Sequence, residues 1–161
     1  MSGPSHETVH GSAVALGTHG VLLLGDSGSG KSSLAARLID TQNARLIADD
    51  RVQLTAQDDR LLLAPDARLA GLLELRGLGL LRLPYVTHKA LTLVVRLVAA
   101  EQVPRLPEAA YFTQADISVP QLALHAHHAA TPLTIVHAVT ALATGFAEDA
   151  IYDISGAVSD A

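Results

Sequence analysis

The chain of 161 residues contains no cysteine and no tryptophan, and aromatic side chains make up only 3% of it. Without cysteine, disulfide bonds, thiolate catalysis and cysteine-ligated zinc sites are excluded. Because hydrophobic residues still reach 49%, the core must be built from leucine, valine, isoleucine and alanine. A chain of this length is one domain of ordinary size. We therefore expect a single domain over residues 1–161, with loose tails at 1–7 and 147–161.

Positive charge and long apolar runs are also scarce. The formal net charge is -5 and no block of lysine and arginine occurs, which argues against nucleic acid as a partner. The longest apolar stretch, residues 91–100, is interrupted by Arg96 and is too short to cross a bilayer. Residues 1–10 lack the charged-then-apolar pattern of a secretion signal. We therefore expect a soluble, cytoplasmic protein without a membrane partner.

What the sequence does contain is a phosphate-binding pattern. Residues 25–32 read Gly-Asp-Ser-Gly-Ser-Gly-Lys-Ser, which is the P-loop pattern G-x-x-x-x-G-K-S. The glycines let backbone N–H groups turn toward a phosphate chain, Lys31 supplies positive charge, and Ser32 offers a hydroxyl to Mg²⁺. Residues 21–24 predict a buried strand before the loop, and residues 33–39 predict a helix after it. The predicted nucleotide-binding residues are Gly25, Asp26, Ser27, Gly28, Ser29, Gly30, Lys31, Ser32 and Ser33.

Elsewhere short strands outnumber helices. His19-Gly20 is interpreted as a turn, residues 57–59 as the turn of a hairpin, and residues 77–79 as a tight turn. A closing helix is expected over residues 131–142, ending at Gly145. This interleaving predicts an α/β domain with a mixed sheet and not a regular βαβ array. Strands are predicted over residues 9–16, 45–48, 52–55, 61–64, 71–76, 91–98 and 117–124, the last broken at Pro120.

Two adjacent acids follow the predicted strand 45–48. A P-loop enzyme needs a carboxylate at a strand end near the transferred phosphate, to hold Mg²⁺ through water or to accept a proton from the attacking hydroxyl. Neighbouring side chains in an extended segment point to opposite faces, so one of Asp49 and Asp50 can face the phosphate. Asp49 is the candidate for that role. The alternative is a solvated turn pair ahead of Arg51.

Another pair of opposite charges lies in the predicted strand 71–76. Glu74 and Arg76 share one face of such a strand. Glu74 could then bind Mg²⁺ while Arg76 binds a phosphate oxygen. The alternative is an exposed ion pair that contributes little to stability.

Three histidines gather at His125, His127 and His128. If this segment is a strand, His125 and His127 face the same way and could hold a transition metal. The alternative is a polar loop that happens to contain histidine, since no carboxylate ligand lies close by in sequence.

Taken together, four segments resemble the HPr kinase/phosphorylases, bacterial enzymes that phosphorylate a serine of the sugar-transport phosphocarrier HPr. They are His10-Gly11, the P-loop, Leu-Ile-Ala-Asp-Asp-Arg-Val at 46–52 and Leu-Glu-Leu-Arg-Gly-Leu-Gly at 73–79. The resemblance covers about residues 8–143, which correspond to the catalytic domain of the family. The separate N-terminal domain of longer members is expected to be absent, as in short alphaproteobacterial members.

The resemblance implies a P-loop fold similar to that of phosphoenolpyruvate carboxykinase, with ATP and Mg²⁺ as cofactors. By position, Lys31 would contact the transferring phosphoryl group and Ser32 and Glu74 would bind Mg²⁺. Asp49 would take the proton from the acceptor serine, and His10 would lie near the phosphoryl site. Further candidates for phosphate or substrate contacts are Asp50, Arg51 and Arg76.

The implied function is a protein serine kinase that acts on an HPr-like carrier and regulates carbohydrate or nitrogen phosphotransferase signalling. Longer members form hexamers, so a homo-oligomer is expected. They also carry a proline-glycine-arginine loop that supports the reverse reaction, whereas the matching residues 122–130 contain no arginine. This departure argues against phosphorylase activity. Two alternatives are a nucleotide-binding regulatory module without transfer activity and a P-loop kinase of a small metabolite.

Overall fold

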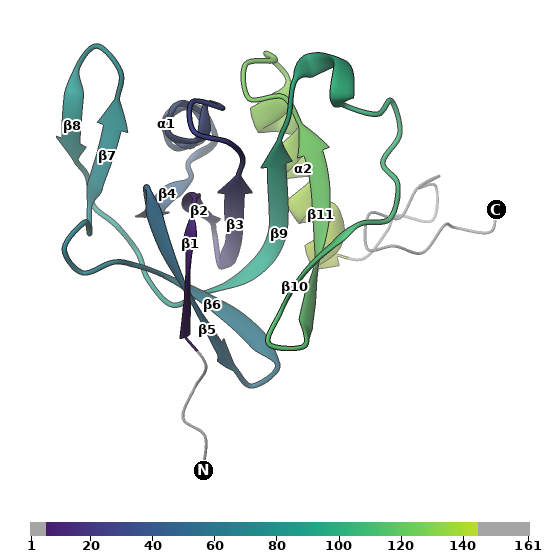
Figure 1. The fold of residues 1–161 in the computed structure, drawn as a ribbon, viewed down its shortest axis with the longest axis horizontal. Coiled ribbons are helices and arrows are strands. Elements are labelled where there is room, and N and C mark those ends of the chain that lie inside the picture. The colour runs from purple at the N-terminus through teal and green to yellow at the C-terminus, as the bar shows by residue number, and fades with distance from the viewer. Residues whose placement is uncertain (1–5, 145–161) are drawn as a thin grey trace.

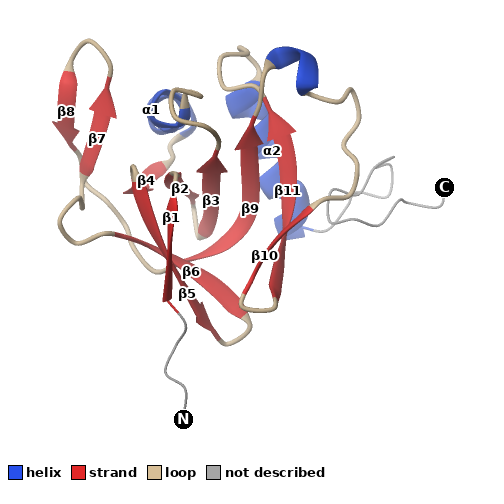
Figure 2. Ribbon diagram, viewed as in Figure 1, coloured by secondary structure: helices blue, strands red, loops and turns tan. Residues whose placement is uncertain are grey.

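The computed structural model describes residues 6–144, which form eleven strands, two α-helices and one short 3-10 helix (Figures 1 and 2). The helices are α1 (Lys31–Gln42), α2 (Thr131–Thr144) and the 3-10 helix η1 (Ala100–Gln102). The strands are β1 (His6–His10), β2 (Ser12–Leu16), β3 (His19–Leu24), β4 (Arg45–Ala48), β5 (Arg51–Gln57), β6 (Arg60–Pro65), β7 (Leu72–Leu75), β8 (Gly79–Arg82), β9 (Lys89–Leu97), β10 (Tyr111–Gln114) and β11 (Ile117–Leu124).

Nine of these strands form one mixed sheet, as predicted. Its order is β1-β5-β6-β9-β3-β2-β4, with β11 also on β9 and β10 on β11. Strands β3 and β11 run parallel to β9, whereas the other pairs are antiparallel. The carboxyl ends of β3, β9 and β11 therefore lie at one edge, which is where ligands bind in such sheets. Strands β7 and β8 form a separate hairpin that projects beside α1 (Figure 1).

Both faces of the central strands are buried, which explains the unbroken apolar run before the P-loop. Val21 and Leu23 of β3 point into a cluster that includes both helices. Leu22 and Leu24 point into a second cluster formed with β5 and β6. Within residues 6–144, no helix is long and apolar enough to span a membrane.

The core position of Leu23 predicts a large loss of stability on truncation. Leu23 is 0% exposed, so Leu23→Ala should lower the free energy of unfolding by about 2–5 kcal/mol, through lost apolar contacts and a residual cavity. Urea unfolding followed by circular dichroism measures this change. Leu80→Ala is the matched control, because Leu80 is 67% exposed and should change stability far less. Equal effects of the two variants would contradict the assigned core.

The single strand predicted over residues 9–16 is wrong, because Gly11 divides it into β1 and β2. Strand β1 pairs with β5, whereas β2 pairs with β3 and β4. A Cβ at Gly11 would lie 2.7 Å from the carbonyl oxygen of Leu23, so only glycine allows this close approach. The prediction that residues 6–7 are loose is also wrong, since they belong to β1. The other predicted tail residues, and Gly145, lie outside the described residues.

The turn predicted at His19-Gly20 is likewise wrong. Both residues begin β3, and the turn lies at Gly17 and Thr18, where Gly17 has a φ of 62°. A Cβ at Gly20 would lie 2.9 Å from the carbonyl oxygen of Ala90 in β9. The glycine therefore serves a close approach between strands and not a turn.

Strand β11 has the predicted bounds but is not broken at its proline. Residues 117–120 pair with β10, and residues 121–124 pair with β9. Pro120, which lacks an N–H group, lies where the partner changes, and such a position tolerates proline. Strands β8 and β10 were not predicted, since Gly79 was interpreted as part of a turn and no strand was assigned to residues 111–114.

Candidate active site

The P-loop connects β3 to the N-terminus of α1. Gly28 and Gly30 have φ values of 81° and 96°, in the left-handed region that favours glycine. A Cβ at Gly30 would lie 2.8 Å from the Cβ of Ala126, so this position also lacks room for a side chain. The helix begins at Lys31, earlier than predicted. The N–H groups of its first turn lack partners within the helix and favour an anion at this end.

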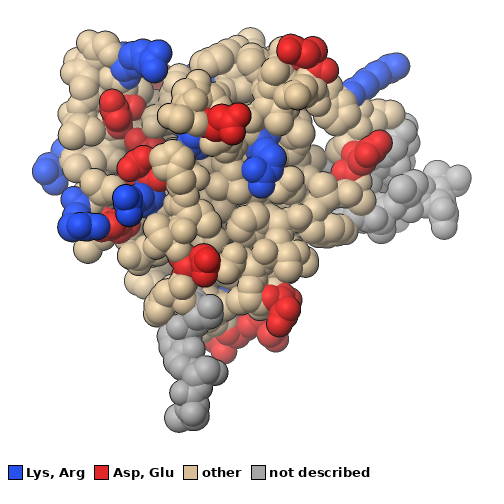
Figure 3. Space-filling view, in the orientation of Figure 1, with Lys and Arg blue, Asp and Glu red and all other residues tan. Residues whose placement is uncertain are grey.

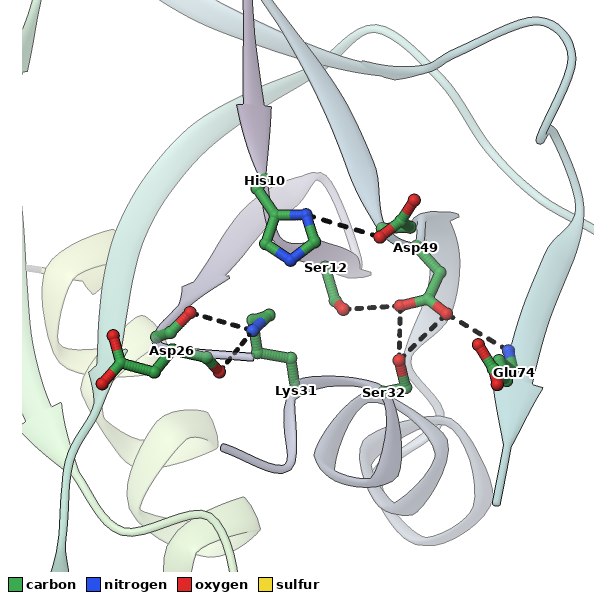
Figure 4. A network of polar contacts seen from close by, with 9 residues as sticks. His10, Ser12, Asp26, Lys31, Ser32, Asp49 and Glu74 are labelled. Carbon is green, nitrogen blue, oxygen red and sulfur yellow. Dashed lines mark hydrogen bonds and ion pairs between the residues drawn. The ribbon is translucent and has the colours of Figure 1, made fainter. Parts of the chain in front are cut away.

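Lys31 is buried against the loop that it follows. Its Nζ donates hydrogen bonds of 2.9 Å to the carbonyl oxygens of both Gly25 and Asp26 (Figure 4). Both acceptors are neutral, so these bonds position the ammonium group without cancelling its charge. The geometry therefore presents a positive charge at the start of the helix.

Three donors converge on the buried carboxylate of Asp49, which is 6% exposed. Ser32 Oγ donates to Oδ1 and Oδ2 at 2.7 and 3.0 Å, and Ser12 Oγ donates to Oδ1 at 2.6 Å (Figure 4). The backbone N–H of Glu74 donates to Oδ2 at 3.2 Å. This network joins the P-loop helix, β2, β7 and the turn that follows β4, so segments distant in sequence fix one carboxylate.

Asp50 points away from this network. Its Oδ1 lies 3.4 Å from Nδ1 of His10, and the two side chains are 61% and 59% exposed. The acids therefore do separate into a buried one and an exposed one. The segment is not extended as predicted, however, because Asp50 has a φ of 68° and Arg51 N–H donates to the Asp49 carbonyl oxygen at 2.8 Å.

A cleft of about 570 Å³ brings most of the predicted site residues together. Glu74, at the end of β7, and Arg76, just beyond it, form part of its wall and are exposed. Arg51 does not line it: this residue lies at the start of β5, opposite His10. The lining residues are His10, Ser12, Ser27, Gly28, Gly30, Lys31, Ser32, Ser33, Asp49, Asp50, Glu74, Leu75, Arg76 and His127.

Two polar lining residues, Ser12 and His127, were missed by sequence reasoning. Ser12 is 1% exposed, and its only sequence signal is that it follows His10-Gly11. His127 was considered only as a metal ligand on a strand. Strand β11 ends at Leu124, so the histidines lie in a loop, where the rings of His125 and His127 meet edge to face at 5.6 Å. Among residues 6–144, no three histidine, cysteine, aspartate or glutamate side chains lie close enough together to hold a metal ion.

Charged side chains of both signs gather on the side of the molecule that carries β7 and β8 (Figure 3). Outside the cleft, the hydrogen bond from the Arg68 side chain lowers the pKa of Asp66, and the same bond raises the pKa of Arg68. This pair does not line the cleft. The cleft itself combines a lysine, four serines and carboxylates, a set that suits phosphate and a divalent cation.

A family model described as the HPr serine kinase C-terminal domain matches residues 4–149. The chain belongs to this family. The fold of this HPr serine kinase domain is similar to that of the HPr(Ser) kinase/phosphatase from Coxiella burnetii, with a TM-score of 0.72. The two chains are 25% identical, and the similarity covers 86% of this chain and 89% of that one. No curated protein matches the chain. Membership of the HPr serine kinase family makes the chain a phosphotransferase.

Proposed function

We propose that the domain is an ATP- and Mg²⁺-dependent kinase that transfers the γ-phosphoryl group to a serine of an HPr-like phosphocarrier protein. The observation that carries this proposal is the hydrogen bond of 2.7 Å between Ser32 of the P-loop and the buried carboxylate of Asp49. It brings a phosphate-binding turn and a candidate base into one cleft. Family membership and the likeness to an HPr(Ser) kinase/phosphatase support the choice of substrate.

The donor set of the cleft fits Mg²⁺. Ser32 supplies a hydroxyl oxygen and Glu74 supplies carboxylate oxygens, which are the ligands that this cation prefers. Ser32 and Glu74 would hold the ion, directly or through water. When bound, Mg²⁺ would neutralise charge on the phosphates as the phosphoryl group moves.

The residues of the chain have separate tasks in the proposed reaction. The backbone around Gly28 and Gly30 binds phosphate oxygens, and Lys31 moves its ammonium group from the loop carbonyls to the transferring group. The serine oxygen forms a bond to the γ-phosphorus while the bond to the β,γ-bridging oxygen breaks, and ADP leaves. Asp49 accepts the serine proton. His10 and Arg76 lie on the wall of the cleft, where they can contact the incoming group.

Label transfer tests this function. The purified chain, Mg²⁺ and γ-labelled ATP should label an HPr-like protein, and an acceptor whose serine is replaced by alanine should stay unlabelled. ATP binding without any transfer would instead support a regulatory module. Transfer to a small molecule but not to the carrier would support a metabolite kinase. Either result would overturn the proposed function.

The proposed role of Glu74 as a Mg²⁺ ligand predicts that its replacement raises the Mg²⁺ concentration that phosphoryl transfer requires. Glu74→Gln removes one carboxylate from the cleft wall, so the Mg²⁺ concentration at half-maximal transfer should rise about tenfold, as the loss of a charged ligand implies. A Mg²⁺ titration of the initial rate measures it. Glu101→Gln is the control, because Glu101 is an exposed carboxylate of η1 outside the cleft. An unchanged titration for Glu74→Gln would remove this residue from the metal site.

The proposal also covers the cellular location, the oligomeric state and the regulatory role of the enzyme. We propose a cytoplasmic homo-oligomer, hexameric as the family resemblance implies, that regulates carbohydrate or nitrogen phosphotransferase signalling. The mixed sheet with its P-loop agrees with a fold similar to phosphoenolpyruvate carboxykinase. Light scattering of the purified chain tests the oligomeric state.

A further inference from the structure

We propose that His127 is a phosphate-binding residue of the cleft, donating a hydrogen bond from its imidazole to the β- or γ-phosphate of the nucleotide. This inference rests on the proposed nucleotide site. It concerns a residue of the loop after β11 that lies outside the P-loop and outside the Asp49 network.

The ring of His127 packs directly against the P-loop. Its Cε1 and Nε2 atoms lie 3.0 and 3.1 Å from the point that a Cβ of Gly30 would occupy. The missing side chain of Gly30 therefore makes room for the imidazole. Gly30 is the N-cap of α1, the end of a helix that attracts phosphate. A ring nitrogen at this place lies beside the surface to which a phosphate chain binds.

The loop is held in place on both sides of His127. The guanidinium of Arg37, on α1, donates hydrogen bonds to the carbonyl oxygens of Ala126 and His128. Thr131 Oγ1 donates to the carbonyl oxygen of His125 at 2.6 Å. These hydrogen bonds fix the backbone before and after His127. They therefore keep its exposed ring at the cleft, in addition to the contact between the ring and Gly30.

The surroundings of the ring favour an anionic ligand. The cleft around His127 includes Ser27, Gly28 and Lys31. The neighbouring ring of His125 meets it edge to face, and Nδ1 of His125 lies 2.9 Å from the carbonyl oxygen of Val98, which fixes that ring. An imidazole N–H paired with a phosphate oxygen is a charge-assisted hydrogen bond, stronger than one between neutral groups.

Calorimetry on the full chain tests the contact with MgATP, MgADP and AMP as probes. His127→Phe keeps a ring against Gly30 but removes the donor, so MgATP should bind about tenfold more weakly, the loss expected for one charge-assisted bond. His127→Gln should recover part of this loss, because its amide donates. Binding of AMP, which lacks the terminal phosphates, should change little. His137→Phe, an exposed histidine of α2, is the control and should leave MgATP binding unchanged.

A double-mutant cycle separates this contact from a structural effect. Arg37→Met frees the loop, so it should weaken MgATP binding in the wild-type background but add little to His127→Phe. Unchanged MgATP affinity in His127→Phe would overturn the inference while leaving the proposed function intact. Equal losses for MgATP and AMP would also overturn it, since the ring would then contact the nucleoside or the α-phosphate and not the terminal phosphates. Absence of nucleotide binding by the wild-type chain would overturn the proposed function as well.

Discussion

Asp49→Asn should reduce phosphoryl transfer by about 10²–10⁴-fold, the usual contribution of a general base. The substitution keeps the shape of the side chain and an oxygen that can accept the hydrogen bonds of Ser12 and Ser32. It removes the negative charge and the capacity to take the proton of the serine hydroxyl. MgATP binding should therefore survive within a few-fold while transfer is lost. Single-turnover label transfer and calorimetry measure the two quantities separately.

Asp50→Asn is the matched control for this prediction. Asp50 is the neighbouring acid, but its side chain is 61% exposed and faces His10 at 3.4 Å. This variant should retain most of the transfer rate. Retained transfer in Asp49→Asn, or equal losses in the two variants, would refute the assignment of Asp49 as the base.

Lys31→Ala should remove nucleotide affinity and transfer together. The ammonium group is the buried cation at the start of α1, and a hydrogen bond to a charged group contributes about 1.5–3 kcal/mol. MgATP binding should therefore weaken by about 10–150-fold, and transfer should fall further because the moving phosphoryl group loses its positive partner. Calorimetry and label transfer are again the measurements.

Two further variants keep this prediction specific. Lys31→Met preserves the apolar stem against the loop and should lose MgATP affinity like Lys31→Ala, which would attribute the loss to charge. Lys89→Ala removes the lysine at the start of β9, outside the cleft, and should bind MgATP normally. Normal MgATP binding by Lys31→Met would contradict the role given to the ammonium group.

Much of the candidate site could be predicted from short stretches of the sequence. The P-loop spacing predicted the turn, the strand before it and the helix after it, because glycine conformation and apolar runs are properties of neighbouring residues. Asp49 was predicted from its place at a strand end. Glu74 was predicted from the charge pattern of the expected strand 71–76, the resemblance added His10, and the structure brings both to the same cleft.

What sequence reasoning missed depends on contacts between distant segments. Gly11 was interpreted as part of one strand, yet the backbone of β3 approaches it so closely that only glycine fits. Gly20 was interpreted as a turn residue, yet glycine is needed there because the backbone of β9 approaches it. Ser12 is 37 positions from Asp49, and nothing local pairs them. His127 meets Gly30 only because β3 and β11 flank β9 in parallel, so that the loops after them lie together. Sheet order decides such neighbours, and it is not a local property.

The central claim is that one cleft holds the triphosphate between the P-loop and Asp49. A crystal structure of the chain with Mg²⁺ and a non-hydrolysable ATP analogue tests it most directly. We predict phosphate density against Gly28, Gly30 and Lys31, with a metal ion beside Ser32. The account would be contradicted by a nucleotide bound elsewhere. It would also be contradicted if, at a saturating concentration of the analogue, Lys31 stayed on the P-loop carbonyls and no phosphate bound to the loop.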